Sequence, residues 1–134
     1  MVYLYKKPLS EKQWSNKILY HVYLIFYTET RHGKFWWSIE KNGETLFLQM
    51  STNLEDVRDK LDGVRRISQS NSWYWKPQLI LHDSSLETFA NLYNFIIVTD
   101  QMNITYNFAD ENCKKFAKIL FDRIARTKTW NYTI

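Results

Sequence analysis

The chain has 134 residues, enough for one domain with a single sizeable core, and its 45% apolar and 24% charged residues are typical of a folded globular protein. These values exclude intrinsic disorder and a coiled coil, and no apolar run is long enough to predict a transmembrane helix. The formal net charge of +4 would suit an acidic partner, but the basic residues are scattered, which is typical of an ordinary protein surface.

The first half of the chain predicts an antiparallel meander. Residues 18–29 and 34–41 are rich in aromatic and β-branched side chains, as strands usually are. The dipeptide Asn42-Gly43 is a strong signal for a two-residue hairpin into a third strand at 44–50. We therefore expect these three strands to be sequential neighbours in one sheet.

The middle of the chain gives weaker signals. Residues 53–61 predict a short helix, because Asn53 can cap its start and Gly63 follows its end. Residues 64–72 predict a strand fragment followed by a polar loop, and residues 73–82 predict another extended run.

Two further helices are expected in the last third. One begins at Ser84 or Ser85, either of which can cap it, and continues to about residue 95. The clearest helix covers residues 110–126, with acidic residues at its start and arginines near its end, as the helix dipole favours. Its apolar side chains form one stripe, which contains Cys113, Phe116, Ala117, Leu120, Phe121 and Ile124.

The only cysteine, Cys113, falls in the first turn of that last helix. A single cysteine excludes a disulfide within the chain and a zinc site built on several cysteines, and we expect no metal or cofactor. The absence of paired cysteines favours a reducing compartment, which predicts a cytoplasmic protein. The thiol is therefore either a core filler or a nucleophile, and the start of a helix favours the thiolate that a nucleophile needs.

The sequence around the cysteine carries a family resemblance. Residues 106–117, with the pair Asn112-Cys113, resemble the cysteine motif of lecithin–retinol acyltransferase-like proteins, a circularly permuted branch of the papain-like, NlpC-type superfamily. With the meander placed before the cysteine helix, the resemblance covers roughly residues 18–50 and 103–126. It implies an α+β fold in which a small antiparallel meander packs against a late nucleophile-type helix.

The resemblance also implies a histidine at the start of the second strand, in a His-Trp-apolar pattern. Trp36 occupies the matching position in this chain, and tryptophan cannot act as a general base. The nearest histidine is His32, in the preceding turn, and we expect it to approach the thiol. His21 and His82 are the other candidates.

The family's third polar group lies on the next strand, close to Gln49 of this sequence. Gln49 could orient an imidazole, although its alternation with Leu48 and Met50 also fits a side chain that faces solvent. Cys113, His32 and Gln49 are thus the predicted site residues.

Two functions follow from this interpretation. The first is a thiol hydrolase or acyltransferase that acts on an amide, ester or thioester through an acyl-cysteine intermediate, with an acyl or peptide-like substrate. The alternative is a catalytically inactive papain-like scaffold that binds a protein or nucleic acid, with the aromatic runs at 35–37 and 73–75 available for stacking. In either case residues 1–17 are expected to be a lead-in, and residues 18–134 a single domain.

Overall fold

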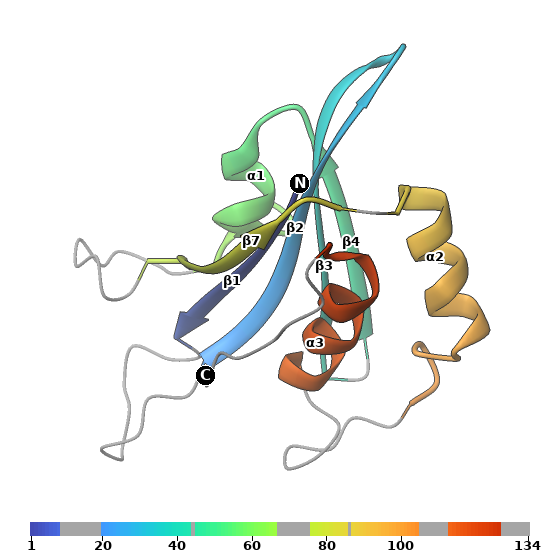
Figure 1. The fold of residues 1–134 in the computed structure, drawn as a ribbon. Coiled ribbons are helices and arrows are strands. Elements are labelled where there is room, and N and C mark those ends of the chain that lie inside the picture. The colour runs from blue at the N-terminus through green and yellow to red at the C-terminus, as the bar shows by residue number, and fades with distance from the viewer. Residues whose placement is uncertain (9–19, 44, 67–75, 86, 105–112, 127–134) are drawn as a thin grey trace.

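A computed structural model describes residues 1–8, 20–43, 45–66, 76–85, 87–104 and 113–126. The fold is α+β, as predicted, and its main sheet is antiparallel with five strands (Figure 1). These strands are β1 (Val2–Pro8), β2 (Tyr20–Thr30), β3 (Gly33–Asn42), β4 (Thr45–Ser51) and β7 (Gln78–Asp83). Their order across the sheet is β4-β3-β2-β1-β7. The remaining elements are α1 (Leu54–Arg58), β5 (Lys60–Leu61), β6 (Val64–Arg65), α2 (Phe89–Val98) and α3 (Cys113–Ile124).

The predicted meander is confirmed, because β2, β3 and β4 are sequential neighbours in the sheet. The hairpin between β3 and β4 closes at the pair Asn42 and Thr45. Gly43 in this turn has a φ of 61°, a backbone conformation that glycine adopts without a steric penalty. The Asn-Gly signal therefore identified the turn correctly.

The expected lead-in at the N-terminus is wrong for the residues that can be described, because Val2–Pro8 form the strand β1 between β2 and β7. Val2 and Leu4 are fully buried on one face of the sheet, while Tyr3 and Tyr5 pack on the other. This alternation is typical of a central strand. Residues 9–17 of the expected lead-in lie outside the described residues.

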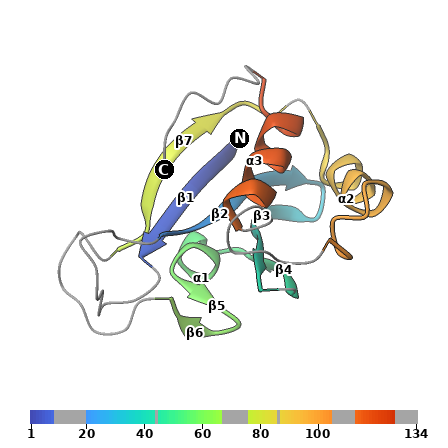
Figure 2. The same cartoon turned by 90° about the horizontal axis from the view of Figure 1, so that it is seen from below.

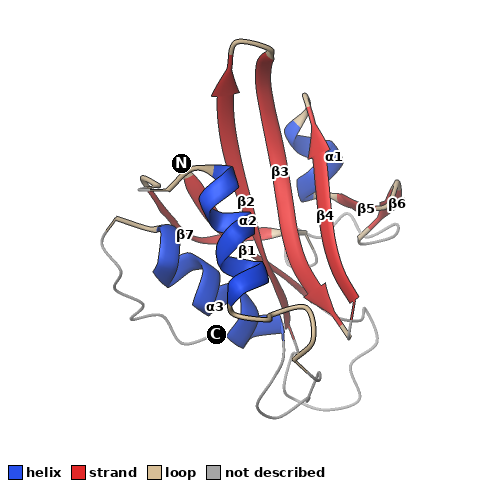
Figure 3. Ribbon diagram, turned by 90° about the vertical axis from the view of Figure 1, so that its right-hand side faces the viewer, coloured by secondary structure: helices blue, strands red, loops and turns tan. Residues whose placement is uncertain are grey.

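The two faces of the sheet carry different layers, which Figures 2 and 3 show from two directions. Helices α2 and α3 cover one face, and α1 with the β5–β6 hairpin lies on the other. Buried apolar side chains form a cluster on each face of the sheet. The larger cluster lies under α2 and α3 and contains Val2, Leu4, Val22, Leu24, Phe26, Ile39, Leu92, Ile96, Phe116, Leu120 and Phe121. The apolar stripe predicted for the last helix is buried along its whole length, as expected. Among the described helices, none is long and apolar enough to cross a membrane.

The helix expected at residues 53–61 is shorter than predicted and ends at Arg58. The chain then forms the β5–β6 hairpin, which closes through Asp62 and Gly63 at φ values of 52° and 76°. Positive φ at both central residues is the requirement of the tightest hairpin turns, for which Asp-Gly is a preferred pair. The Asp62-Gly63 dipeptide therefore favours a hairpin turn over continuation of the helix.

Helix α2 also begins later than predicted, at Phe89, with Thr88 as its cap. The Thr88 side chain accepts a hydrogen bond from the backbone N–H of Asn91. Ser85 cannot serve as the cap, because its hydroxyl bonds the backbone of Glu87 instead. After the helix, the buried ammonium of Lys41 on β3 donates to the carbonyls of Gln101 and Ile104, which fixes the following turn against the sheet.

Two expected extended segments are described only in part. The run expected at 73–82 corresponds to β7 from Gln78 onward, and residues 73–75 lie outside the described residues. The strand fragment expected within 64–72 is β6, and residues 67–72 lie outside them as well.

Tyr23 provides a test of how α1 is held on the sheet. Its hydroxyl donates a 2.7 Å hydrogen bond to the carbonyl of Arg58, the last residue of α1. We expect Tyr23→Phe to lower the free energy of unfolding by about 1–3 kcal/mol, because a partly buried carbonyl loses its donor. Tyr27→Phe, which removes an exposed bond to Glu29, is the matched control and should cost less than about 0.5 kcal/mol in the same urea titration. Equal costs for the two variants would contradict this anchoring role.

Candidate active site

The thiol of Cys113 lies at the start of α3 and faces the sheet. Its side chain belongs to the buried core, with 5% of the residue exposed, and α3 packs on β2 and β3. The backbone of Val22 on β2 lies near the sulfur and helps to lower the pKa of the thiol. The predicted position, in the first turn of the last helix and on its buried face, is confirmed.

A histidine from β2 meets this thiol. His21 is the second residue of that strand, is 3% exposed, and lies close enough to the Cys113 thiol for each group to shift the pKa of the other. The pairing between β2 and β3 ends at Leu24 and Ile39, although both strands continue beyond that pair. The two strands are therefore no longer bonded to each other where Cys113 and His21 meet.

The next strand supplies a carboxylate to the same histidine. The Nε2 atom of His21 lies 2.5 Å from Oε2 of Glu40 on β3, and both side chains are almost fully buried. An imidazole has only two nitrogens, so a proton donated from Nε2 to Glu40 leaves Nδ1 to face the thiol. Cys113, His21 and Glu40 thus form a thiol–imidazole–carboxylate series from α3, β2 and β3.

Arg66, directly after β6, holds the carboxylate in place. Its two terminal nitrogens donate to both oxygens of Glu40, at 2.9 and 2.5 Å, and one of them also donates to the carbonyl of Val57. The guanidinium lies over the ring of Tyr23, 4.0 Å from its centre, and the side chain is 1% exposed. A bidentate pair of this kind fixes the orientation of the carboxylate as well as its charge.

These contacts favour the charged forms of all three groups of the series. Burial opposes ionisation of Cys113, but the interaction with His21, the backbone of Val22 and the charge of Lys114 together outweigh burial and lower the pKa of the thiol. Burial likewise opposes protonation of His21, yet its interactions with Cys113 and Glu40 raise the pKa of the imidazole. Burial would raise the pKa of Glu40, but His21 and Arg66 lower it to about 2. The arrangement therefore favours a thiolate beside an imidazolium.

The pKa of Glu40 predicts how stability depends on acid. Because that pKa is about 2 in the folded protein against an ordinary 4.5, the ionised carboxylate contributes about 3 kcal/mol at neutral pH. A depressed pKa stabilises above the unfolded value, so this contribution is lost as pH falls from about 5 toward 2. In urea titrations at about pH 6 and about pH 3, Glu40→Gln should show a smaller loss of stability than the wild type. The exposed Glu55→Gln serves as the control, and identical losses in all three proteins would contradict the prediction.

A cavity of about 260 Å³ on the α1 side of the sheet has the imidazole and the carboxylate in its lining. Its lining is mostly basic and polar. The residues around it are Lys7, His21, Glu40, Asn42, Leu61, Val64, Arg65 and Arg66.

The structure does not bring the predicted histidine, His32, to the thiol. His32 lies in the exposed turn between β2 and β3, where it accepts a hydrogen bond from Arg31, at the opposite end of β2 from His21. The third candidate, His82, is on β7 and packs against Tyr3. The expectation about His32 is thus corrected, and the histidine beside Cys113 is His21, one of the two other candidates.

Gln49 has a structural position rather than a contact with the site histidine. Its amide donates to the Ser38 hydroxyl and to the carbonyl of Lys60, and its carbonyl accepts the backbone N–H of Asp62. These bonds tie the β5–β6 hairpin to the main sheet. The expectation that Gln49 orients the imidazole is corrected accordingly, because Glu40 occupies that position.

The misplaced histidine has a simple cause. The resemblance implies a histidine at the start of the second strand, and without a strand at Val2–Pro8 the second strand is the one that contains Trp36, which packs against Tyr3 and Tyr27. With β1 included, the second strand is β2, and His21 lies at its start. The alternation in the N-terminal Val-Tyr-Leu-Tyr is the sequence signal for a first strand, which would identify β2 as the second strand.

Comparison with known proteins does not extend this description. No family model, no curated protein and no solved structure matches the chain. The function is therefore argued from the geometry of Cys113, His21, Glu40 and Arg66.

Proposed function

We propose that the protein is a cysteine-dependent hydrolase or acyltransferase, with Cys113 as nucleophile and His21 as its acid and base. The observation that carries this proposal is the buried series of thiol, imidazole and carboxylate. Its members come from three elements that meet only in the folded chain. A nucleophile, a base within hydrogen-bonding reach and a group that orients the base are the parts of covalent acyl-transfer sites.

The energetics of the site support a functional role. Burying ions such as Glu40 and Arg66 costs several kcal/mol for each group before their attraction compensates. Apolar side chains of similar size would often give equal or greater stability in the same space. Stability alone therefore gives little reason for these ionisable groups to occupy the interior of so small a domain.

The first step would be attack of the Cys113 thiolate on the carbonyl carbon of an amide, ester or thioester. The bond from sulfur to carbon forms as the bond from carbon to the leaving group breaks. His21 gives its Nδ1 proton to the leaving group as it departs. Glu40 remains ionised throughout, and it holds the ring while stabilising the imidazolium.

The second step would release the acyl group and regenerate the free Cys113 thiolate. A water molecule or an acceptor hydroxyl, amine or thiol gives its proton to His21 and attacks the acyl-cysteine carbonyl. The bond from carbon to sulfur breaks, and the thiolate is regenerated. Water gives a hydrolase and another acceptor gives an acyltransferase. Since the chemistry needs a reduced thiol, the proposal includes a reducing compartment, namely the cytoplasm.

The order of the site residues along the chain supports the family resemblance. A histidine at the start of the second strand, a polar group on the next strand and a cysteine on a late helix follow the order that a permuted papain-like domain implies. His21, Glu40 and Cys113 take these places. Residues 105–112, which carry most of the cysteine motif, lie outside the described residues.

One observation favours the alternative of an inactive scaffold. Cys113 is only 5% exposed, which suits a core filler better than a group that must reach a substrate. The reactivity of the thiol in the folded protein separates the two functions, because a buried and inert thiol would not react at low pH.

Alkylation by iodoacetamide across a range of pH tests the proposal. A free thiol with a pKa of about 8.5 is only about 0.3% ionised at about pH 6 and reacts slowly there. We expect the folded protein to react at that pH many times faster, because His21 stabilises the thiolate. His21→Ala should move the reaction to the pH range of a free thiol.

The controls for this experiment are provided by the chain. Cys113→Ser gives the blank, since the chain has no other cysteine. His32→Ala removes an exposed histidine and should leave the profile unchanged. A profile that rises only above about pH 8.5 and is insensitive to His21→Ala would favour the inactive scaffold.

A further inference from the structure

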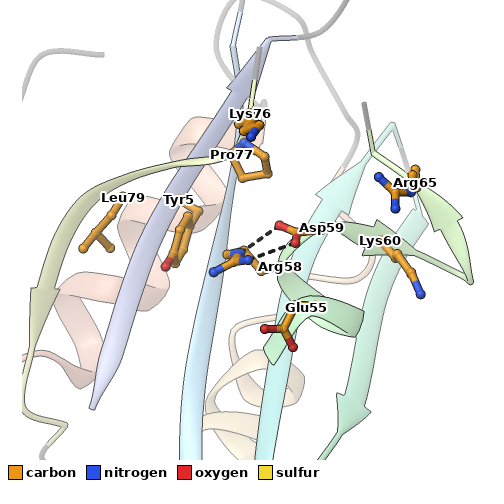
Figure 4. A pocket seen from close by; sticks show the side chains of 9 residues that line it. All are labelled: Tyr5, Glu55, Arg58, Asp59, Lys60, Arg65, Lys76, Pro77 and Leu79. Atoms are coloured by element: carbon orange, nitrogen blue, oxygen red, sulfur yellow. Dashed lines mark hydrogen bonds and ion pairs between the residues drawn. The ribbon is translucent and has the colours of Figure 1, made fainter. Parts of the chain in front are cut away.

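A second and larger cavity lies on the α1 side of the sheet, away from Cys113. It encloses about 680 Å³, within the range of small-molecule sites, between α1, the β5–β6 hairpin and the strands β1 and β7 (Figure 4). Its lining includes Tyr5 and Leu79, the pair Arg58 and Asp59, and the basic residues Arg65 and Lys76. None of them belongs to the thiol–imidazole–carboxylate series.

Among the described residues that line this cavity there is an excess of positive charge, with four basic side chains against two acidic ones. Arg58 is matched by Asp59, which it binds through two hydrogen bonds of 2.8 and 2.9 Å. Within the described part of the chain, Arg65 and Lys76 form no ion pair. Two unmatched cations in one concave site are a favourable environment for an anion.

The opposite end of the cavity is apolar. Figure 4 shows Tyr5 and Leu79 side by side at one end, with Lys60 and Arg65 at the other. Leu79 is 46% exposed, and the ring of Tyr5 stacks on Tyr23 beneath it. The cavity thus combines an apolar wall with a basic end.

We propose that this cavity binds an organic phosphate, a mono- or diphosphate ester whose body is apolar or aromatic. The phosphate would lie against Arg65 at the basic end of the cavity, because guanidinium groups form strong charge-assisted hydrogen bonds with phosphate oxygens, and Lys76 would add to the positive field that attracts it. The body of the ligand would pack on Tyr5 and Leu79. A dissolved nucleotide and a phospholipid headgroup both present this chemistry. Arg65 also lines the cavity that reaches His21, so the bound ligand lies next to the proposed active site, but its binding does not depend on the thiol.

Calorimetric titration of the full chain with ADP and with inorganic pyrophosphate tests the site for a dissolved ligand. Vesicles of phosphatidylcholine, with and without phosphatidic acid, test the lipid source in a sedimentation assay. We expect saturable binding of ADP, of the phosphatidic acid vesicles, or of both. The double variant Arg65→Gln/Lys76→Gln should weaken that binding at least about tenfold, through loss of charged hydrogen bonds.

A matched variant distinguishes binding in the cavity from nonspecific attraction to the positive charge of the protein. Arg31→Gln/Lys34→Gln removes two positive charges from exposed side chains in the turn between β2 and β3 and at the start of β3, and it should change the affinity by less than about twofold at physiological salt. Leu79→Ser should weaken ADP but not pyrophosphate, since only ADP has a body for the apolar wall. No binding of any probe, or equal losses in the two double variants, would overturn the proposal. A normal alkylation profile in Arg65→Gln/Lys76→Gln would confirm that its fold and thiol are intact.

Discussion

Replacing Arg66 by methionine is expected to lower the free energy of unfolding by about 3–5 kcal/mol. The change leaves the Glu40 carboxylate in the interior without the two hydrogen bonds that it now receives from the guanidinium. It also removes the cation that stacks on Tyr23 and the bond to the Val57 carbonyl. Urea titration followed by tryptophan fluorescence measures the effect. Arg65→Met, one residue earlier on an exposed side chain, is the matched control and should cost less than about 0.5 kcal/mol.

The double variant Arg66→Met/Glu40→Gln shows whether the charge of Glu40 causes this loss. When both charges are removed, no unmatched ion remains in the interior, so the double variant should cost clearly less than the sum of the two single changes. A loss below about 1 kcal/mol for Arg66→Met alone, or simple additivity of the pair, would show that the two side chains are not coupled.

Truncation of the core beneath α3 should have a similarly large effect. Leu24 lies at the centre of β2, is fully buried and belongs to the cluster that α3 covers. We expect Leu24→Ala to lower the free energy of unfolding by about 2–5 kcal/mol, from lost apolar burial and the cavity left behind. Leu48→Ala makes the same chemical change on β4, where the side chain is 42% exposed, and should cost less than about 1 kcal/mol. Similar losses for the two variants would place the core elsewhere.

The parts of the fold that the sequence predicted well are those governed by local patterns. The alternation in β2 and β3, the Asn-Gly turn and the apolar stripe of α3 each depend on residues close together in the chain. The central strand β1 was missed, because its few apolar residues are followed at once by Lys6, Lys7 and Pro8. Its neighbours in the sheet are β2 and β7, and no local sequence pattern predicts this pairing.

The site was predictable only in part for the same reason. Cys113 could be placed from the helix that it begins, and the helix start already suggests a reactive thiol. Whether His21 or His32 meets the thiol depends on which end of β2 lies beside the start of α3, and this is a contact between segments far apart in the chain. Glu40 and Arg66 are polar residues at interior positions. Their burial cannot be predicted from the sequence, because it arises only when the hairpin after α1 folds back onto β3.

The position of β1 between β2 and β7 has a consequence for the order in which the parts of the fold can assemble. The hairpins from β2 to β4 join neighbouring segments, so they require only short loops to close. Strand β7, by contrast, pairs with the very first residues of the chain, and α3 comes later still. Until α3 docks, the growing chain presents the uncovered apolar face of its sheet to the surroundings, and such surfaces invite aggregation. The thiol meets its imidazole in that same docking event, so reactivity at low pH reports completion of folding.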